Sequence, residues 1–226
     1  MPIYKYETHC HTSETSRCSA INGIDLVRYY HSLGYSGVCI TDHFFNGNTT
    51  VPKEIDWNKK TEMFAAGYNN AVAEGNKLGI SVFFGWEYSY QGADFLTYGL
   101  SAEWLLANPT LMSWSLNEYL ERARSDGAFI VHAHPFREAG YIPMIHLIPG
   151  RVDAVEIYNA SMTDDVNLRA QWYADSYGLK PFAGSDMHSD QRPRLCGIES
   201  EVLLSDVSEF TAILKRGEYN VFDLQK

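Results

Sequence analysis

The sequence has few cysteines and no long hydrophobic run, and both absences restrict the class of protein. Its four cysteines form no CxxC pair and are too few for a disulfide scaffold, so free thiols in a reducing compartment are expected. No apolar stretch approaches the length that crosses a bilayer. The first residues show no basic-then-apolar signal pattern, which predicts a cytoplasmic protein with no membrane partner.

Positive charge is also scarce. The chain has 18 Lys and Arg against 28 Asp and Glu, a formal net charge of -10. A sequence-independent contact with nucleic acid needs many phosphate contacts from Lys and Arg, so we expect no long nucleic acid as a partner. A small anionic substrate is still compatible with this charge, because bound divalent cations would reverse the local field.

The 226 residues contain no repeat, low-complexity tract or linker, which predicts one domain over residues 1–226. Apolar spacing, with glycines and a capping pattern at the ends, predicts helices at 24–33, 57–78, 115–127, 164–177 and 206–216. Short apolar runs, typical of buried parallel strands, lie at 37–41, 81–85, 128–131, 154–158 and 181–184. This alternation predicts an α/β protein with a barrel-like sheet.

Each apolar run ends in, or contains, a side chain of the type that binds metal. These side chains are Asp42, His43, Glu87, His132, His134, Glu156, Asp186 and His188. In parallel β/α folds, the carboxyl ends of the strands and the loops after them form the active face. Five separate segments are therefore expected to bring ligand-type side chains to one rim.

Six of the eight histidines fall in four compact motifs. The motifs are His9-Cys-His11, Thr41-Asp-His43, His132-Ala-His134-Pro135 and Asp186-Met-His188. Two histidines separated by one residue on a strand lie on the same face, where they can chelate one ion. Imidazole and carboxylate ligands suit zinc, manganese or iron better than calcium. Each motif alone is weak, but the ordered set predicts metal binding; His31 and His146, outside it, are expected to be structural or surface residues.

As a set, these motifs resemble those of the PHP (polymerase and histidinol phosphatase) superfamily. The matching motifs are His9-Cys-His11, Thr41-Asp42-His43, Gly85-Trp-Glu87, His134-Pro135 and Gly184-Ser-Asp186-Met-His188. The resemblance spans residues 6 to 188 in the expected order. It implies a distorted seven-stranded β/α barrel with two or three metal ions at the strand ends. It also implies metal-activated hydrolysis of phosphoesters.

The resemblance implies a ligand set for each ion. The first ion would be held by His9, His11, Glu87 and Asp186, the second by Glu87 and His134, and the third by His43 and His188. Glu87 would bridge the first two ions.

Two places depart from the family pattern. Many members carry a further His or Asp shortly after the HxH motif, where this chain offers Glu14 as a replacement ligand or Arg17 as a cation. Some members also have a His between the Gly-x-Glu and His-Pro motifs. This chain has none there, which leaves Asp94 or His132 as the replacement.

The expected chemistry is attack on phosphorus by a hydroxide held between the ions, which lower the pKa of water and neutralise charge. Besides the bridging Glu87, we count Asp42 and His188 as catalytic candidates, because either can protonate a leaving group. Glu156 and Asn159 resemble a family motif beside the site and are expected to orient ligands or to add to them.

Three arginines follow the ligand motifs and are candidates for binding a phosphate, although a surface position is equally compatible with each. They are Arg137, Arg192 and Arg194. The sequence therefore predicts a metal-dependent phosphoesterase acting on a small phosphoester, either a phosphomonoester or a nucleotide-type substrate. Two alternatives stay open: an amidohydrolase-type enzyme using the same ions, and a non-catalytic metal-binding accessory domain.

Overall fold

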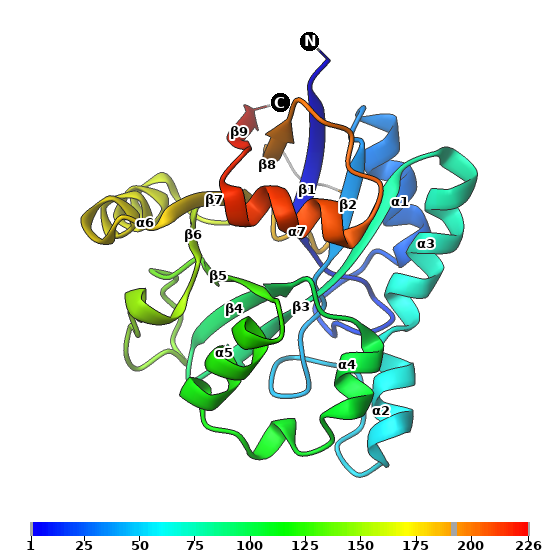
Figure 1. Ribbon diagram of the computed structural model, residues 1–226, viewed down its shortest axis with the longest axis vertical. Helices are drawn as coiled ribbons and strands as arrows, with labels where there is room; N and C mark the ends of the chain where they lie inside the picture. The colour runs from blue at the N-terminus through cyan, green and yellow to red at the C-terminus, as the bar shows by residue number, and fades with distance from the viewer. Residues whose placement is uncertain (1, 191–193, 226) are drawn as a thin grey trace.

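The computed structural model describes residues 2–190 and 194–225, and the strands in these residues form one sheet with helices around it (Figure 1). The strand order in the sheet is β7-β6-β5-β4-β3-β2-β1-β8-β9. The strands are β1 (Tyr4–Cys10), β2 (Gly37–Ile40), β3 (Ser81–Tyr90), β4 (Ala93–Tyr98), β5 (Phe129–Ala133), β6 (Ala154–Asn159), β7 (Lys180–Gly184), β8 (Arg194–Ser200) and β9 (Asn220–Gln225).

The helices lie outside the sheet, with α1 packed against α3 and α6 packed against β6 (Figure 1). The α-helices are α1 (Gly23–Ser32), α2 (Trp57–Phe64), α3 (Ala66–Leu78), α4 (Ala102–Ala107), α5 (Leu116–Ser125), α6 (Asp164–Tyr177) and α7 (Val207–Arg216). Short 3-10 turns lie at Leu111–Ser113 and Pro149–Arg151. None of the helices in the described ranges is long and apolar enough to cross a membrane.

The sheet curves until the ends of β1 and β7 lie beside each other, so the barrel is nearly closed. β7 is the terminal strand in the sheet order, yet the residues that follow it hydrogen-bond to the end of β1. The Met187 amide donates to the His9 carbonyl at 3.1 Å, and the His11 amide donates to the Met187 carbonyl at 2.9 Å. The barrel-like closure expected from the sequence is therefore confirmed, and β8 with β9 extends the sheet beyond β1.

The expected number of seven strands is not confirmed, because the sheet of the described residues contains nine. β4 lies antiparallel between β3 and β5, in a stretch with no predicted strand. The connection from β3 is a two-residue hairpin turn, in which Gln91 has φ 49° and Gly92 has φ 93°. Such turns need positive φ at both positions, which glycine supplies at the second one. All six residues of β4 are buried, so the strand lacks the polar alternation that marks a strand exposed on one face.

The helix predicted at 57–78 is interrupted at Ala65, which divides it into α2 and α3. The first turn of α3 packs closely against the loop after β1: a Cβ atom added at Gly67 would lie 2.0 Å from Oγ1 of Thr12. Four other predicted helices agree with α1, α5, α6 and α7 within two residues at each end. The capping pattern that begins with Ser115 is present at the start of α5.

The barrel end opposite the strand carboxyl termini is filled by aromatic side chains. The Phe210 ring from α7 stacks on Phe83 with 4.6 Å between centroids and meets Tyr98 edge-on at 5.7 Å. Both partners are buried, as is Tyr6 of β1, which also contacts Phe210. Burial of such a side chain contributes roughly 1.5–3 kcal/mol, so this end is a stable apolar base. The polar residues lie at the other end.

Candidate metal centre

Seven imidazole and carboxylate side chains from five strand ends meet at the open end of the barrel. They form three overlapping groups, each with three ligand atoms within 4.8 Å of one another. The groups are His9, His11 and Asp186; His9, Glu87 and His134; and His11, His43 and His188. Six of these seven residues are buried and His188 is partly exposed, so the cluster opens to solvent on the His188 side.

The first group has the spacing of ligands around one ion. His9 Nε2 lies 3.2 Å from His11 Nε2, and Asp186 Oδ1 lies 3.3 Å from His11 Nε2 and 3.6 Å from His9 Nε2. Two ligands bound to a tetrahedral zinc ion at about 2.0–2.1 Å are about 3.3 Å apart. These three side chains can therefore hold an ion with little movement.

Glu87 lies between the histidines of the second and third groups. Its Oε1 atom is 3.1 Å from Nε2 of His134, and its Oε2 atom is 2.6 Å from Nδ1 of His43. Burial opposes ionisation of Glu87, but His43, His134 and His9 outweigh it and hold its pKa well below the usual range. Glu87 Oε2 and His43 Nδ1 are buried, and neither makes a hydrogen bond of good geometry with the described residues. Glu87 Oε1 also lies 3.5 Å from His9 Nε2, and Oε2 lies 3.7 Å from His11 Nε2, so each oxygen is near the ligand nitrogen of a different histidine.

A buried carboxylate behind the cluster fixes the orientation of two ligands. Glu156 Oε1 lies 2.9 Å from Nδ1 of His9, and its Oε2 accepts hydrogen bonds from the His134 amide at 2.9 Å and Asn159 Nδ2 at 2.8 Å. Donation from His9 Nδ1 leaves Nε2 free to bind an ion. A Cβ atom added at Gly184 would lie 2.4 Å from Cβ of His9, so only glycine permits this close packing.

Ser16 was not singled out from the sequence, yet it connects several parts of the cluster. Its hydroxyl donates to Oδ1 of Asp42 at 2.7 Å, accepts from the His43 amide at 3.0 Å and lies 3.1 Å from His11 Nδ1. Because the hydroxyl proton is used by Asp42, the contact with His11 requires a proton on Nδ1, which leaves His11 Nε2 available for an ion. An isolated serine in a loop carries no sequence signal for this role.

Asp42 is not placed to act as the general acid. Its carboxylate accepts from the Thr12 amide at 2.6 Å, Thr12 Oγ1 at 2.7 Å and Ser16 Oγ at 2.7 Å. Burial raises its pKa to about 6, although these hydrogen bonds act in the opposite direction. The side chain is 2% exposed and does not line the cavity beside the cluster. Asp42 therefore hydrogen-bonds to the loop after β1 and does not line the cavity.

A cavity of about 470 Å³ lies directly beside the cluster. Its lining includes His43, Asp94, Arg137, Asp186 and His188. Arg137 Nη2 donates to Asp94 Oδ2 at 2.9 Å. Asp94, considered as a replacement metal ligand, therefore pairs with Arg137 and belongs to none of the three groups. Arg137 reaches the cavity wall with part of its charge compensated.

Neither replacement expected after the HxH motif faces the cluster. Both oxygens of Glu14 accept from the Gly23 amide at the start of α1, and Oε1 also accepts from Asn70 Nδ2. Arg17 is exposed and its Nε donates to the Thr49 carbonyl. The chain makes a helical turn here, with the Ser16 amide bonded to the Thr12 carbonyl, so successive side chains point in different directions. Glu14 and Arg17 therefore point away from the cluster, and their predicted roles are not supported by this geometry.

Cys18, a residue passed over in the sequence, lies at the cavity edge of the cluster. Its Sγ atom is 3.2 Å from Nε2 of His43. Burial opposes ionisation of the thiol, but hydrogen bonds with His188 and His43 outweigh it and lower its pKa to about 6. The other three cysteines of the chain are buried. A neighbouring pair of histidines is the only local signal that could have identified Cys18, and it appears only in three dimensions.

His132 does not join the cluster, although it precedes His134 by two residues. Its ring stacks on Phe95 with 5.0 Å between centroids and meets Tyr173 edge-on at 5.9 Å. Neither ring nitrogen has a hydrogen-bond partner among the described residues, and burial lowers the pKa of His132 to about 3. β5 ends at Ala133 and His134 has φ 27°, so the alternation of an extended strand is lost between the two histidines. The expectation that both rings face one ion was wrong.

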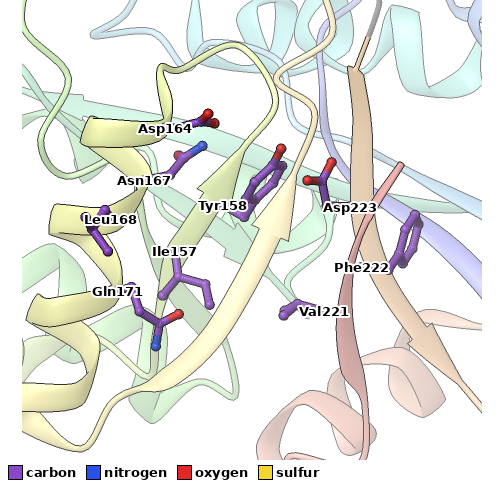
Figure 2. A pocket seen from close by; sticks show the side chains of 9 residues that line it. All are labelled: Ile157, Tyr158, Asp164, Asn167, Leu168, Gln171, Val221, Phe222 and Asp223. Carbon is purple, nitrogen blue, oxygen red and sulfur yellow. The ribbon is translucent and has the colours of Figure 1, made fainter. Parts of the chain in front are cut away.

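Arg194 was expected at the phosphate site, but it lies elsewhere. Its guanidinium pairs with Asp164 at 2.7 Å and Asp223 at 3.5 Å. These two carboxylates line a different cavity, of about 380 Å³, formed by α6, β6 and β9 (Figure 2). Arg194 is therefore an ion-pair residue between α6 and β9. Arg192 lies outside the described residues, so its predicted role stays a prediction.

The sequence matches no family model and no curated protein. Solved structures do match in fold. A two-domain protein from Bacteroides vulgatus that contains a predicted PHP-like metal-dependent phosphoesterase is 15% identical with a TM-score of 0.68, over 98% of this chain and 65% of that one. This chain therefore spans about two thirds of the two-domain protein.

Two further structures are similar over most of their length. PsfC from Pseudomonas syringae is 17% identical with a TM-score of 0.64, over 100% of this chain and 93% of that chain. An amidohydrolase from Chromobacterium violaceum, solved with bound sulfate, is 13% identical with a TM-score of 0.54, over 98% of both chains. At these identities the likeness concerns the fold. The chain thus shares the fold of these proteins, one of which contains a predicted PHP-like phosphoesterase, and this fold agrees with the one that the motif resemblance implies.

Proposed function

We propose that this protein is a metal-dependent phosphoesterase that hydrolyses a small phosphoester beside the seven-residue cluster. The observation that carries the proposal is the position of Glu87, whose two oxygens face His134 on one side and His43 on the other. This arrangement suits two or three divalent ions, and the imidazole and carboxylate donors suit zinc, manganese or iron. The seven residues of the three groups are the proposed ligands.

Bound ions would supply Lewis acidity and lower the pKa of a water molecule. The side chains of the protein would orient the metal ligands and the substrate. Glu156 and Ser16 would fix the orientation of His9 and His11, and Arg137, which lines the cavity, would orient an anionic group. We assign His188 to ion binding and not to proton donation, because a nitrogen that binds an ion has no proton to give.

The cavity and the charge of the chain favour a small substrate. A volume of about 470 Å³ is in the range of small-molecule sites. An extended polyanion would be repelled by a net charge of -10, whereas a compact phosphoester meets only the ions and the cavity wall. The sulfate bound by the Chromobacterium protein is a tetrahedral anion of similar shape to a phosphate group.

A second candidate function is hydrolysis of an amide or ester, since one structurally similar protein is named an amidohydrolase. The ion pair between Arg137 and Asp94 favours this alternative, because it reduces the positive charge available to a phosphate. Arg137→Ala discriminates between the two functions. The variant should raise KM for phosphate esters more than for carboxylate esters, and equal effects on both would favour the amidohydrolase.

The proposal is tested with metal-reconstituted protein and a panel of phosphorylated metabolites. Elemental analysis should find two or three ions per chain, and Glu87→Gln should abolish turnover while the circular dichroism spectrum stays unchanged. His31→Gln, on the exposed face of α1, is the control and should keep full activity. One ion or none, or comparable losses in the two variants, would overturn the assignment. Metal bound without hydrolysis of any ester or amide would identify a non-catalytic metal-binding domain.

A further inference from the structure

The third group of the cluster has only imidazole ligands within it. His11, His43 and His188 can hold an ion, but His11 also lies at the ligand spacing of the first group through the same Nε2 atom. Its Nδ1 atom is occupied by Ser16. If His11 serves the first ion, the third ion has His43 and His188 alone. Two protein ligands are fewer than zinc sites normally have, so another side chain is needed.

The loop after β1 supplies that side chain. Cys18 Sγ lies 3.2 Å from Nε2 of His43, and Cys18, His43 and His188 line the same cavity. His188 Nδ1 contacts the Asp186 carbonyl at 2.9 Å, which leaves Nε2 as the nitrogen free to coordinate. A sulfur at about 2.3 Å and a nitrogen at about 2.0–2.1 Å from a tetrahedral zinc ion lie about 3.5 Å apart. The observed separation is therefore close to that of two ligands sharing an ion.

The backbone on either side of Cys18 is fixed to the same cluster. The Arg17 amide donates to the Asn48 carbonyl at 3.0 Å, in the loop that follows His43. The Ala20 amide donates to the carbonyl of His188 at 2.8 Å, and Ser19 Oγ donates to the carbonyl of His11 at 2.9 Å. The thiol is thus held against the two histidines by the fold and is not at the tip of an unsupported loop.

We propose that Cys18 is a thiolate ligand of the third ion, together with His43 and His188. This inference rests on the proposed metal centre and specifies one of its positions. On binding, the thiol proton passes to solvent and the sulfur donates an electron pair to the ion. Because thiolate is a soft ligand, this position selects zinc or another thiophilic divalent ion over manganese or magnesium. The three positions are therefore chemically unequal.

Cobalt(II) titration of the metal-free protein tests the inference without substrate. A thiolate ligand gives a near-ultraviolet sulfur-to-cobalt charge-transfer band, whereas histidine and carboxylate ligands give only weaker visible bands. The wild type should show the charge-transfer band, and Cys18→Ser should lose it and bind the third ion about tenfold or more weakly. Arg17→Ala, next to Cys18 but directed away from the cluster, is the matched control and should keep the band.

The outcomes separate this inference from the proposed function. Visible cobalt bands without a charge-transfer band in the wild type would overturn the role of Cys18 and leave the metal centre standing. An unchanged band in Cys18→Ser would also overturn it. No cobalt binding at all would overturn both the inference and the metal centre.

Alkylation of the wild type gives an independent measurement that needs no variant. Cys18 is the one cysteine of the chain that is not buried, so iodoacetamide should modify this residue first in the metal-free protein. Zinc should slow that modification by about tenfold or more, because a coordinated thiolate reacts more slowly. Peptide mass spectrometry identifies the modified residue. Equal alkylation rates with and without bound zinc would contradict coordination by Cys18.

Discussion

Two segments of this protein contain the same His-x-His spacing at the end of a strand, but they place their side chains differently. His9 and His11, at the end of β1, bring their Nε2 atoms within 3.2 Å of each other. His132 and His134, at the end of β5, diverge: His134 reaches Glu87, and His132 stacks between aromatic rings. The spacing predicts a shared face only while the backbone stays extended. A single residue with φ 27°, His134, changes the outcome.

His9 and His132 also differ in the side chains that surround their rings. His9 has a carboxylate at each end of its ring, Glu156 at Nδ1 and Glu87 at Nε2. His132 has no hydrogen-bond partner among the described residues on either nitrogen. A buried imidazole without partners stays neutral and behaves as an aromatic side chain. Histidine spacing therefore identifies a ligand only when carboxylates converge on the same point.

The largest expected effect is a loss of metal affinity when a histidine of the first His-x-His segment is replaced, but not when His132 of the second is replaced. His9→Ala should remove at least one ion and lower the affinity for metal by about 100-fold or more, because His9 belongs to two of the three groups. His132→Phe should leave the metal content unchanged. Elemental analysis after dialysis against a weak chelator measures both. Similar metal loss in the two variants would show that the segments do not differ in the way described.

The next prediction concerns the carboxylate that supports both segments. Glu156→Gln should lower the affinity for metal by about 10–100-fold, since its oxygens contact His9 Nδ1 and the His134 amide. Glu121→Gln, on the exposed face of α5, is the control. Competition with a fluorescent zinc chelator gives the affinities. An unchanged affinity in Glu156→Gln would mean that the orientation of His9 depends on packing alone.

The pH dependence of the free energy of unfolding should show that His132 stays neutral in the folded protein. The pKa of His132 is about 3 in the folded protein against 6.5 for the ordinary side chain, so the unfolded chain binds a proton that the folded chain does not. Below about pH 6.5, the free energy of unfolding should therefore fall, by up to about 1.4 kcal/mol per pH unit from this residue. Above that pH, this contribution is constant.

The measurement compares wild type with His132→Phe, in which the ring is kept and the titrating group is removed. Denaturant unfolding of metal-free protein at neutral pH and at about pH 5 gives the two losses of stability. Between neutral pH and about pH 5, His132→Phe should lose less free energy of unfolding than the wild type. Equal losses would mean that His132 is accessible to protons in the folded state.

The smallest effect is expected at Glu14, which follows the first His-x-His segment without joining its site. Glu14→Ala should lower the free energy of unfolding by about 1 kcal/mol, since its carboxylate accepts from the amide at the start of α1. Its metal content should equal that of the wild type. Thermal unfolding and elemental analysis check the two statements. A loss of one ion would restore Glu14 as a ligand.

The sequence predicted the features that local chemistry determines. Glycines such as Gly79, Gly178 and Gly217 end helices in the left-handed conformation, and their positions bounded the predicted helices. The apolar runs located the buried strands from β2 onward that alternate with these helices. The order of the histidine motifs predicted a barrel-like α/β fold, and the solved structures with similar folds agree with it.

The features that the sequence did not predict depend on tertiary contacts, which leave no local sequence pattern. β4 pairs with β3 through a hairpin turn and with β5 on its other side, and its fully buried residues lack the polar alternation that would have marked it as a strand. Ser16 and Cys18 reach the cluster because a helical turn after Thr12 rotates them inward, away from the direction of Glu14. Arg194 follows a ligand motif in sequence, but an ion pair with Asp164 holds it at another cavity. Proximity in sequence to a motif did not determine proximity in space.

The seam between β1 and β7 has a consequence for the biosynthesis of the protein. The Ser185 amide donates to Oε1 of Glu7 across 178 residues of sequence, and the first group of ligands spans the same junction. During translation the apolar strands and helices can therefore form before the cluster is complete. In the proposed metal centre, an ion of the first group could bind only after the loop after β7 has been synthesised and packed against β1. Such an ion would stabilise the junction between β1 and β7 by mass action, so metal removal should first weaken that junction.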